Sequence, residues 1–157
     1  MAKKNVNLKI SNKQYAESLE PNGETFSREL SLEDSLEIET EGTLYSKDGA
    51  TYITYEESED AGLENNKTLI KFADGRLRIR RFGNEEAGSM DMMLEEGLMN
   101  ITRYYVPAGR IDLEIYTNKL TENLSDESYG KIFADYSIKL DQYLNRRNNL
   151  EIEIMPN

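Results

Sequence analysis

The residues with the most evident chemical potential are the arginines of RLRIRRF, residues 76–82. Successive side chains of a strand point to opposite faces, and three of these arginines share one face: Arg76, Arg78 and Arg80. They are expected on the outside, where they can pair with the outward carboxylates of a neighbouring strand. Arg81 is expected to point inward, where it needs a carboxylate, a ligand anion or water, because burying a lone charge is costly.

Glu57 is the expected partner of Arg81. It ends the segment TYITYEE, residues 51–57, in which Ile53 and Tyr55 share its face. We expect Glu57 and Arg81 to meet near one end of the folded sheet, with tyrosine hydroxyls donating hydrogen bonds nearby. The candidate ligand-binding residues are therefore Arg81, Glu57, Tyr55, Tyr136 and Tyr104.

Two interpretations of this pair stay open. An internal Glu–Arg pair can recognise a ligand, or it can only neutralise itself and fix the register of the strands. A β-bulge at Arg81 or Gly83 would instead turn the guanidinium out to solvent. The pair is a poor general acid, because an adjacent cation stabilises the ionised form of Glu57.

The sequence contains no histidine and no cysteine. This excludes Ser-His-Asp and Cys-His nucleophile systems, histidine-ligated iron and ordinary zinc sites. Neither a GxxxxGK[ST] loop nor a GxGxxG motif after a strand is present, so the common nucleotide-binding folds are unsupported. The 30 acidic residues include no pair singled out for glycoside hydrolysis and no EF-hand pattern. We therefore predict a protein that is not an enzyme and has no cofactor or metal.

The formal net charge of −11 disfavours two classes of partner. An acidic surface repels the phosphates of nucleic acids and the anionic heads of lipids, so we predict neither nucleic-acid nor membrane binding.

The first residues, MAKKNVNLKI, lack the apolar segment of a secretion signal, and no later stretch is apolar enough for a membrane helix. Together with the absence of cysteine, this predicts a cytoplasmic protein.

Strands must position these side chains, because the dominant period of the sequence is two. About ten alternating segments follow one another, and positive-φ dipeptides separate several of them: Asn22-Gly23, Asp48-Gly49 and Asp74-Gly75. Short antiparallel strands in this order form a meander, which closes most simply into an up-and-down barrel. We predict an all-β fold: a single antiparallel up-and-down barrel of about 8–10 strands with little helix. Residues 1–157 are expected to form one domain, ordered from about residue 5 to 155.

Residues 12–34 leave two alternatives open: the segment KQYAESLE forms one helical turn or continues a bent strand.

Elsewhere, alternation assigns these positions to the interior: Leu36, Ile38, Thr40, Gly42, Leu44, Ile111, Leu113, Ile115, Thr117, Ile132, Ala134, Tyr136, Ile138, Leu140, Leu150, Ile152 and Ile154. Four methionines supply either adaptable cavity lining or ordinary core filling at some of their positions: Met90, Met92, Met93 and Met99.

Several short motifs, taken in order, resemble the small bacterial YwiB-like family. They are TEGTLYSKDGATYITYEES, RRFG, YYVPAGRIDLEIYT and GKIFADYSI, and the likeness runs from about residue 36 to 154. The positions that match are Gly42, Tyr45, Tyr55, Glu57, Arg81, Gly83, Tyr104, Gly109, Thr117 and Tyr136. The resemblance implies a calycin-like, lipocalin-like β-barrel and brings no established activity or ligand. The connection between the first strand and residue 36 is longer here than in the smaller members of that family.

Two functions follow as hypotheses. The leading one is a binding module, a barrel whose small internal cavity takes an apolar or amphipathic ligand. The alternative is an interaction protein with a packed interior, which forms a homodimer or binds a partner through the outside of the barrel. Outward aromatic side chains favour this alternative: Tyr45, Tyr52, Tyr116, Phe82 and Phe133.

Overall fold

The computed structural model describes residues 3–56, 67–83, 89–139 and 144–157. Every element within these ranges is a strand. In chain order they are β1 (Lys4–Asn22), β2 (Thr25–Lys47), β3 (Ala50–Glu56), β4 (Lys67–Ala73), β5 (Arg76–Phe82), β6 (Ser89–Glu95), β7 (Met99–Val106), β8 (Gly109–Glu122), β9 (Gly130–Lys139) and β10 (Leu144–Pro156). No helix in the described ranges is long and apolar enough to cross a membrane.

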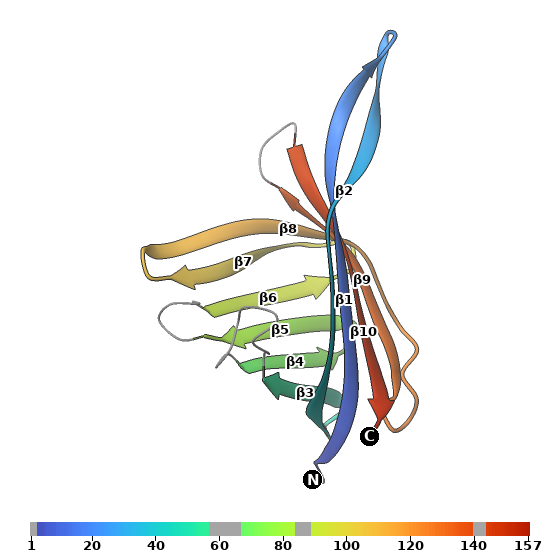
Figure 1. Ribbon diagram of the computed structural model, residues 1–157, viewed down its shortest axis with the longest axis vertical. Coiled ribbons are helices and arrows are strands. Elements are labelled where there is room, and N and C mark those ends of the chain that lie inside the picture. Colours follow the sequence, from blue (N-terminus) through green and yellow to red (C-terminus); the bar gives the residue numbers. More distant parts are fainter. Residues whose placement is uncertain (1–2, 57–66, 84–88, 140–143) are drawn as a thin grey trace.

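The strands form a closed antiparallel barrel in which each strand pairs with its neighbours in the chain. Closure comes from β1, which pairs with β2 on one side and with β10 on the other. Strands β3 to β7 stack across the barrel, and β1, β2, β9 and β10 run steeply across them (Figure 1). The predicted all-β meander barrel is confirmed, with ten strands.

Tight turns join several neighbouring strands as the sequence predicts. Asp48-Gly49 and Asp74-Gly75 have positive φ at both residues, which is the backbone of a type I′ hairpin turn. The first hairpin differs by one residue. Asn22 pairs with Thr25, so the turn residues are Gly23 and Glu24 rather than Asn22 and Gly23.

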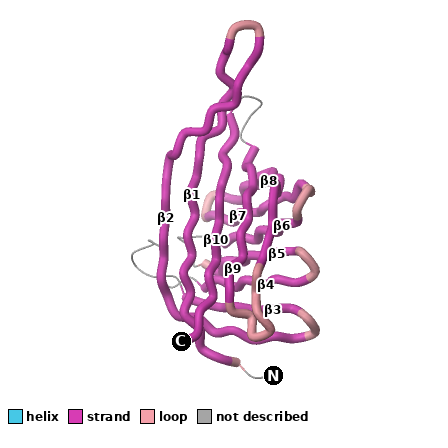
Figure 2. Tube along the Cα trace, turned by 90° about the vertical axis from the view of Figure 1, so that its right-hand side faces the viewer, coloured by secondary structure: helices cyan, strands magenta, loops and turns pink. Residues whose placement is uncertain are grey.

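The segment from 12 to 34 continues the strands and contains no helical turn. β1 and β2 pair along almost their whole length, with one register shift between Gln14 and Tyr15 that leaves Glu33 as the extra residue of a bulge. β10 follows β1 only as far as the pair Ser18 and Leu144. Beyond this point, β1 and β2 have only each other as partners among the described strands, and their tip projects from the barrel (Figures 1 and 2).

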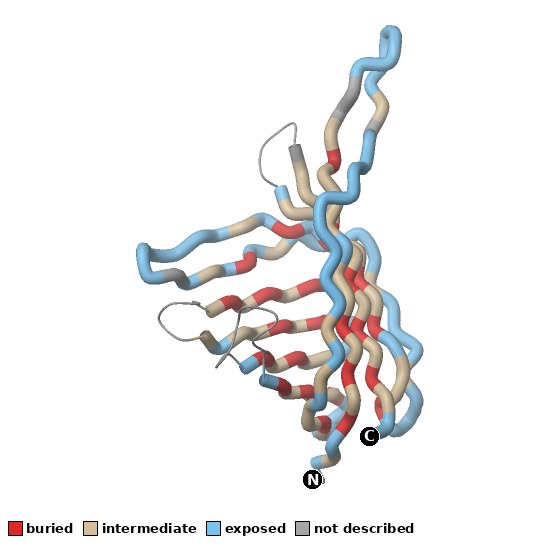
Figure 3. Tube along the Cα trace, in the orientation of Figure 1, coloured by how far each residue is buried: buried red, intermediate tan, exposed pale blue. Residues whose placement is uncertain are grey.

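The core lies on the inner face of the barrel, where buried residues alternate along most of the strands (Figure 3). Most of the predicted interior positions are buried or half-buried. Leu36 and Ile111 are not, with exposed fractions of 48% and 51%. Both have the inward parity, but each lies on a stretch with a described strand neighbour on one side only: β2 pairs with β1 at Leu36, and β8 pairs with β7 at Ile111. Leu140 lies outside the described residues.

The arginines of β5 divide between the two faces as predicted. Arg78 donates two hydrogen bonds to Asp91 of β6, at 3.0 and 2.8 Å, and Arg76 donates one to Glu95 at 3.1 Å. Arg80 lies 3.9 Å from Asp91. The Arg78 hydrogen bonds hold the pKa of the Asp91 carboxyl below its usual value, although partial burial opposes them. These arginines therefore form a cross-strand ion-pair ladder rather than a basic patch.

Candidate functional site

The interior of the barrel contains a partly open cavity of about 270 Å³. It is lined from nearly every strand, by Ile10, Asn12, Gln14, Leu36, Ile38, Tyr55, Thr68, Ile70, Ile79, Arg81, Met90, Met92, Tyr104, Tyr136, Ile138, Asn148, Leu150 and Ile152. Two of the four methionines considered from the sequence contribute to the lining, whereas Met99 is exposed at the surface. The lining is thus a mixture of aliphatic side chains and a smaller polar set.

On the wall formed by β3 to β7, four polar side chains and one methionine form a single cross-strand row. Tyr55 lies opposite Thr68, Thr68 opposite Arg81, Arg81 opposite Met90, and Met90 opposite Tyr104. The row therefore crosses five strands, from β3 to β7. Three of the residues predicted from the sequence belong to it, because they share the inward parity and because the strand register aligns them.

The adjacent row of the same wall is apolar. Ile53 lies opposite Ile70, Ile70 opposite Ile79, and Ile79 opposite Met92. Neighbouring inward positions on one strand are two residues apart, so this row lies next to the polar one. This wall is consequently divided into a polar band and an apolar band.

The facing wall has the same division. On β9, β10 and β1, a polar row joins Tyr136, Asn148 and Gln14. The row of Ala134, Leu150 and Asn12 follows it, and after that come Ile132, Ile152 and Ile10. The polar end of the cavity therefore receives side chains from both walls, including Tyr136, the fourth predicted residue that the structure describes.

Two tyrosines and Arg81 are close enough to influence one another electrostatically. Burial raises the pKa of Tyr136 far above its ordinary value; the nearby Tyr104 adds to this effect and Arg81 opposes it. The pKa of Tyr104 is also raised by burial and opposed by Arg81. Both phenols are therefore neutral at physiological pH and can donate a hydrogen bond. Neither hydroxyl is hydrogen-bonded to any residue in the described ranges.

Asn12 and Asn148 form a partly buried amide pair that sequence reasoning missed. Asn12 Nδ2 donates to Asn148 Oδ1 at 3.1 Å, and Asn148 is only 2% exposed. Asn12 Oδ1 and Asn148 Nδ2 find no partner among the described atoms. Parity with Leu150 and Ile152 is a signal that would have placed Asn148 inside.

The predicted Glu57–Arg81 pair stays a prediction, because Glu57 lies outside the described residues. Arg81 itself is half-buried on the inner face, at the polar end of the cavity. The inward orientation of Arg81 is thus observed, and no bulge at this position turns it out to solvent.

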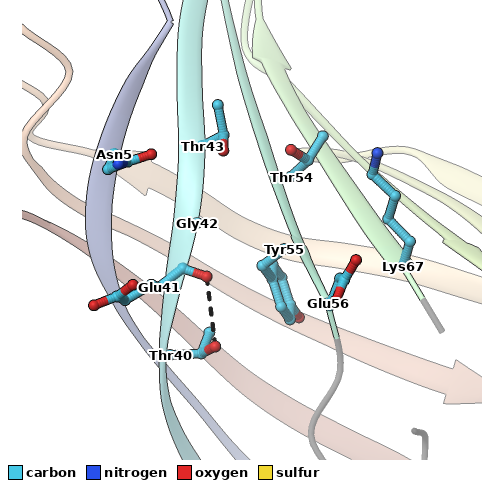
Figure 4. A pocket seen from close by; sticks show the side chains of 9 residues that line it. All are labelled: Asn5, Thr40, Glu41, Gly42, Thr43, Thr54, Tyr55, Glu56 and Lys67. Atoms are coloured by element: carbon cyan, nitrogen blue, oxygen red, sulfur yellow. Dashed lines mark hydrogen bonds between the residues drawn. The ribbon is translucent and has the colours of Figure 1, made fainter. Parts of the chain in front are cut away.

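A second hollow opens on the side of the barrel, where β3 leaves β2 (Figure 4). It has a volume of about 700 Å³ and is lined mainly by polar residues, namely Asn5, Thr40, Glu41, Gly42, Thr43, Thr54, Tyr55, Glu56 and Lys67. Tyr55 lines this lateral cleft and the internal cavity alike. It therefore stands in the wall between the two.

Gly42 shapes the inner end of the lateral cleft. A Cβ at this position would lie 2.7 Å from Leu8 Cδ1 and 2.9 Å from the carbonyl oxygen of Thr54. Only a residue without a side chain lets the backbones of β2 and β3 come this close before the two strands separate.

The described part of the site offers hydrogen-bond donors and apolar contacts. Within the described ranges, no three acidic side chains gather in a way that could hold a metal ion. None of the described cavity-lining residues is a carboxylate. This arrangement is suited to holding a molecule that is apolar at one end and bears oxygen atoms at the other.

Comparisons with known proteins agree with the architecture. The chain is 27% identical over 117 residues to the uncharacterized beta-barrel protein YwiB of Bacillus subtilis (strain 168), covering 74% of this chain and 78% of that protein. The crystal structure of the B. subtilis ywiB protein superposes with a TM-score of 0.70 at 23% identity, covering 98% of this chain and 93% of that one. Residues 23–152 match the family model described as a domain of unknown function, DUF1934. The chain therefore belongs to the DUF1934 family.

Proposed function

We propose that the barrel is a binding module that holds a small amphipathic molecule in its internal cavity. The observation that carries this proposal is the division of both cavity walls into a polar and an apolar band. A core that served stability alone would gain nothing from burying Asn12 Oδ1 and Asn148 Nδ2, which find no hydrogen-bond partner among the described residues, because such groups lose their hydration.

The size of the cavity limits the ligand. Pockets for drug-sized molecules have volumes of roughly 300–1,000 Å³, and this cavity, at about 270 Å³, lies just below that range. A short acyl chain or a single substituted ring fits such a space, whereas a long-chain lipid does not. The apolar part would contact the aliphatic band around Ile70, Ile79 and Met92.

The polar part of the ligand would be an oxygen acceptor. Tyr136 is 8% exposed, and its neutral hydroxyl can donate to an acceptor at the polar end of the cavity. Tyr104 supplies a second phenol donor, and the positive charge of Arg81 favours electron-rich groups nearby. Carboxylic acids, amides and alcohols all present the required oxygen.

The test uses hexanoic acid, hexanamide and hexanol as probes, observed by saturation-transfer NMR with the purified full chain. We expect at least one probe to bind, and we expect Tyr136→Phe to weaken it about tenfold, the effect of losing one buried hydrogen bond of about 1.4 kcal/mol. Tyr116→Phe is the matched control, because Tyr116 is exposed on β8 and lies outside the cavity lining.

Two results would contradict the proposal. One is that no probe binds and native mass spectrometry shows only the bare chain. The other is that Tyr136→Phe and Tyr116→Phe bind the probes as the unmodified protein does, which would place binding outside the cavity.

A further inference from the structure

β2 has a long edge that no described strand covers. β1 pairs with β2 from Thr25 to Leu44, but β3 pairs with it only from Thr43 to Lys47. Between Thr25 and Gly42, the other side of β2 therefore has no strand neighbour within the described ranges. Figure 2 shows β2 as the outermost strand of its wall. An uncovered edge presents unpaired N–H and C=O groups along its length, which can pair with another strand.

The lateral cleft lies at the barrel end of this edge. On one side are Thr40 and Glu41 of β2, and on the other are Thr54 and Glu56 of β3 and Lys67 of β4 (Figure 4). The cleft occupies the line that β3 would follow if it continued along β2. Its volume of about 700 Å³ leaves room for the side chains of an extended segment placed there.

The side chains along the edge are acidic on one face and apolar on the other. Glu37, Glu39 and Glu41 alternate with Leu36, Ile38 and Thr40. Lys9 forms an ion pair with Glu37 at 3.3 Å. No ion pair joins Glu39 or Glu41 to a residue in the described part of the chain. A strand added at this edge would thus meet a row of carboxylates that is only partly neutralised from within.

Exposed apolar side chains continue along β2 up to and into the projecting tip. Leu30, Leu32 and Leu36 are exposed, and Phe26 is the most exposed large apolar side chain, at 69%. The whole stretch combines a backbone edge without a described strand neighbour, acidic groups and exposed apolar groups. This combination is complementary to an extended segment that alternates basic and apolar residues.

We propose that the β2 edge from Thr25 to Gly42 is a docking surface for an extended, basic segment of a partner protein, which adds to the barrel as a strand. Cross-strand pairs between its lysines or arginines and Glu39 and Glu41 would fix its register. A second copy of this chain is the less suitable occupant. Two β2 edges would bring their acidic rows together, and each chain has a net charge of −11.

The experiment uses a short fluorescent peptide that alternates lysine and valine, with a glutamate–valine peptide as the reference. Fluorescence anisotropy measures binding to the full chain. We expect the basic peptide alone to bind, and Glu39→Lys/Glu41→Lys to weaken it at least about tenfold, since reversing two exposed charges removes attraction and adds repulsion. Asp126→Lys/Glu127→Lys is the matched control, because it makes the same charge change in an exposed loop.

Amide hydrogen exchange of the unmodified protein locates the peptide without depending on any variant. Slower exchange in residues 34–42 on addition of the basic peptide would support strand addition at this edge. Three results would overturn the proposal: no binding, equal weakening by both double variants, or protection confined to other strands. A dimer in sedimentation experiments that Glu39→Lys/Glu41→Lys changes would also overturn it, in favour of a second copy as the occupant.

Discussion

A methyl group at position 42 would collide with two neighbours, a flexible one and a rigid one. Leu8 Cδ1 can move, but the carbonyl oxygen of Thr54 belongs to the β3 backbone. We expect Gly42→Ala to lower the free energy of unfolding by about 1–3 kcal/mol, as overpacking of a filled site does. Urea unfolding followed by circular dichroism measures the change.

The double variant Leu8→Ala/Gly42→Ala separates the two collisions. Removing the Leu8 side chain costs about 2–5 kcal/mol by itself, but it also makes room for the new methyl group. We therefore expect the double variant to cost less than the sum of the single changes. Strict additivity would show that Leu8 does not take part in the collision.

Asp135, on the outer face, accepts three hydrogen bonds from side chains in the described part of the chain. Arg147 donates to it twice, at 2.9 and 2.8 Å, and Asn118 donates once, at 3.2 Å. Burial would raise the pKa of Asp135, but these hydrogen bonds outweigh it and hold the pKa below its usual value. Its stabilising effect is therefore complete above the unfolded-state pKa of about 3.9 and is lost as the pH falls through the lower folded-state pKa.

Replacing this residue by asparagine should make the pH dependence visible. We expect Asp135→Asn to lower the free energy of unfolding at pH 7 by about 1.5–3 kcal/mol, the range for hydrogen bonds to a charged group. The deficit should shrink at acidic pH, where the unmodified protein loses the same charge. Asp126→Asn, in an exposed loop, should leave the profile unchanged. A deficit that is constant with pH would contradict the assignment.

For the single residues of the site, the sequence predicts on which face of the sheet each side chain lies. Alternation placed Tyr55, Arg81 and Tyr136 inside, Tyr104 was expected nearby, and the structure brings all four to one cavity. Alternation does not tell which residues lie opposite each other, because that depends on turn positions and bulges. Asn148 shares the inward parity of Leu150 and Ile152, but only the register shows that it lies beside Tyr136.

At the scale of elements, the longest strands were the hardest to predict. β1 and β2 contain 19 and 23 residues, and the bulge after Gln14 interrupts their alternation. The tip beyond the barrel also buries little, so its apolar residues carry no inward signal. The turns were predicted more reliably than the strands. A two-residue type I′ turn requires positive φ at both residues, and Asp-Gly adopts this backbone readily.

The projecting tip should be separable from the barrel. Among the described strands, residues 19–28 pair only within the hairpin, since β10 begins at Leu144, opposite Ser18. We expect replacement of residues 19–28 by Asn-Gly, which joins Ser18 to its partner Glu29 through a type I′ turn, to change the free energy of unfolding by less than about 1 kcal/mol. Urea unfolding is the measurement. A loss of cooperative unfolding would show that the tip takes part in barrel closure.

The charge of the whole molecule opposes its compact state. Lys and Arg together number 19 against 30 Asp and Glu, so repulsion remains after the cross-strand ion pairs have formed. Salt screens this repulsion, and it also weakens the exposed pairs, each of which contributes only about 0–1 kcal/mol. We expect repulsion to dominate, so that Tm rises when NaCl is increased from about 10 to about 200 mM, which shortens the screening length from about 30 Å to below 10 Å.

A less negative variant shows whether net charge is the cause of this rise. Asp126→Lys/Glu127→Lys lowers the negative charge without breaking a side-chain ion pair of the described barrel, since neither side chain takes part in one. Its Tm should therefore be higher at low salt and should increase less as salt is added. Replacing NaCl by KCl should give the same curve, because screening depends on ionic strength and not on the identity of the cation. A Tm that falls with salt would mean that the ion-pair ladder of β5 and β6, and not repulsion between the acidic groups, dominates the electrostatic stability of the barrel.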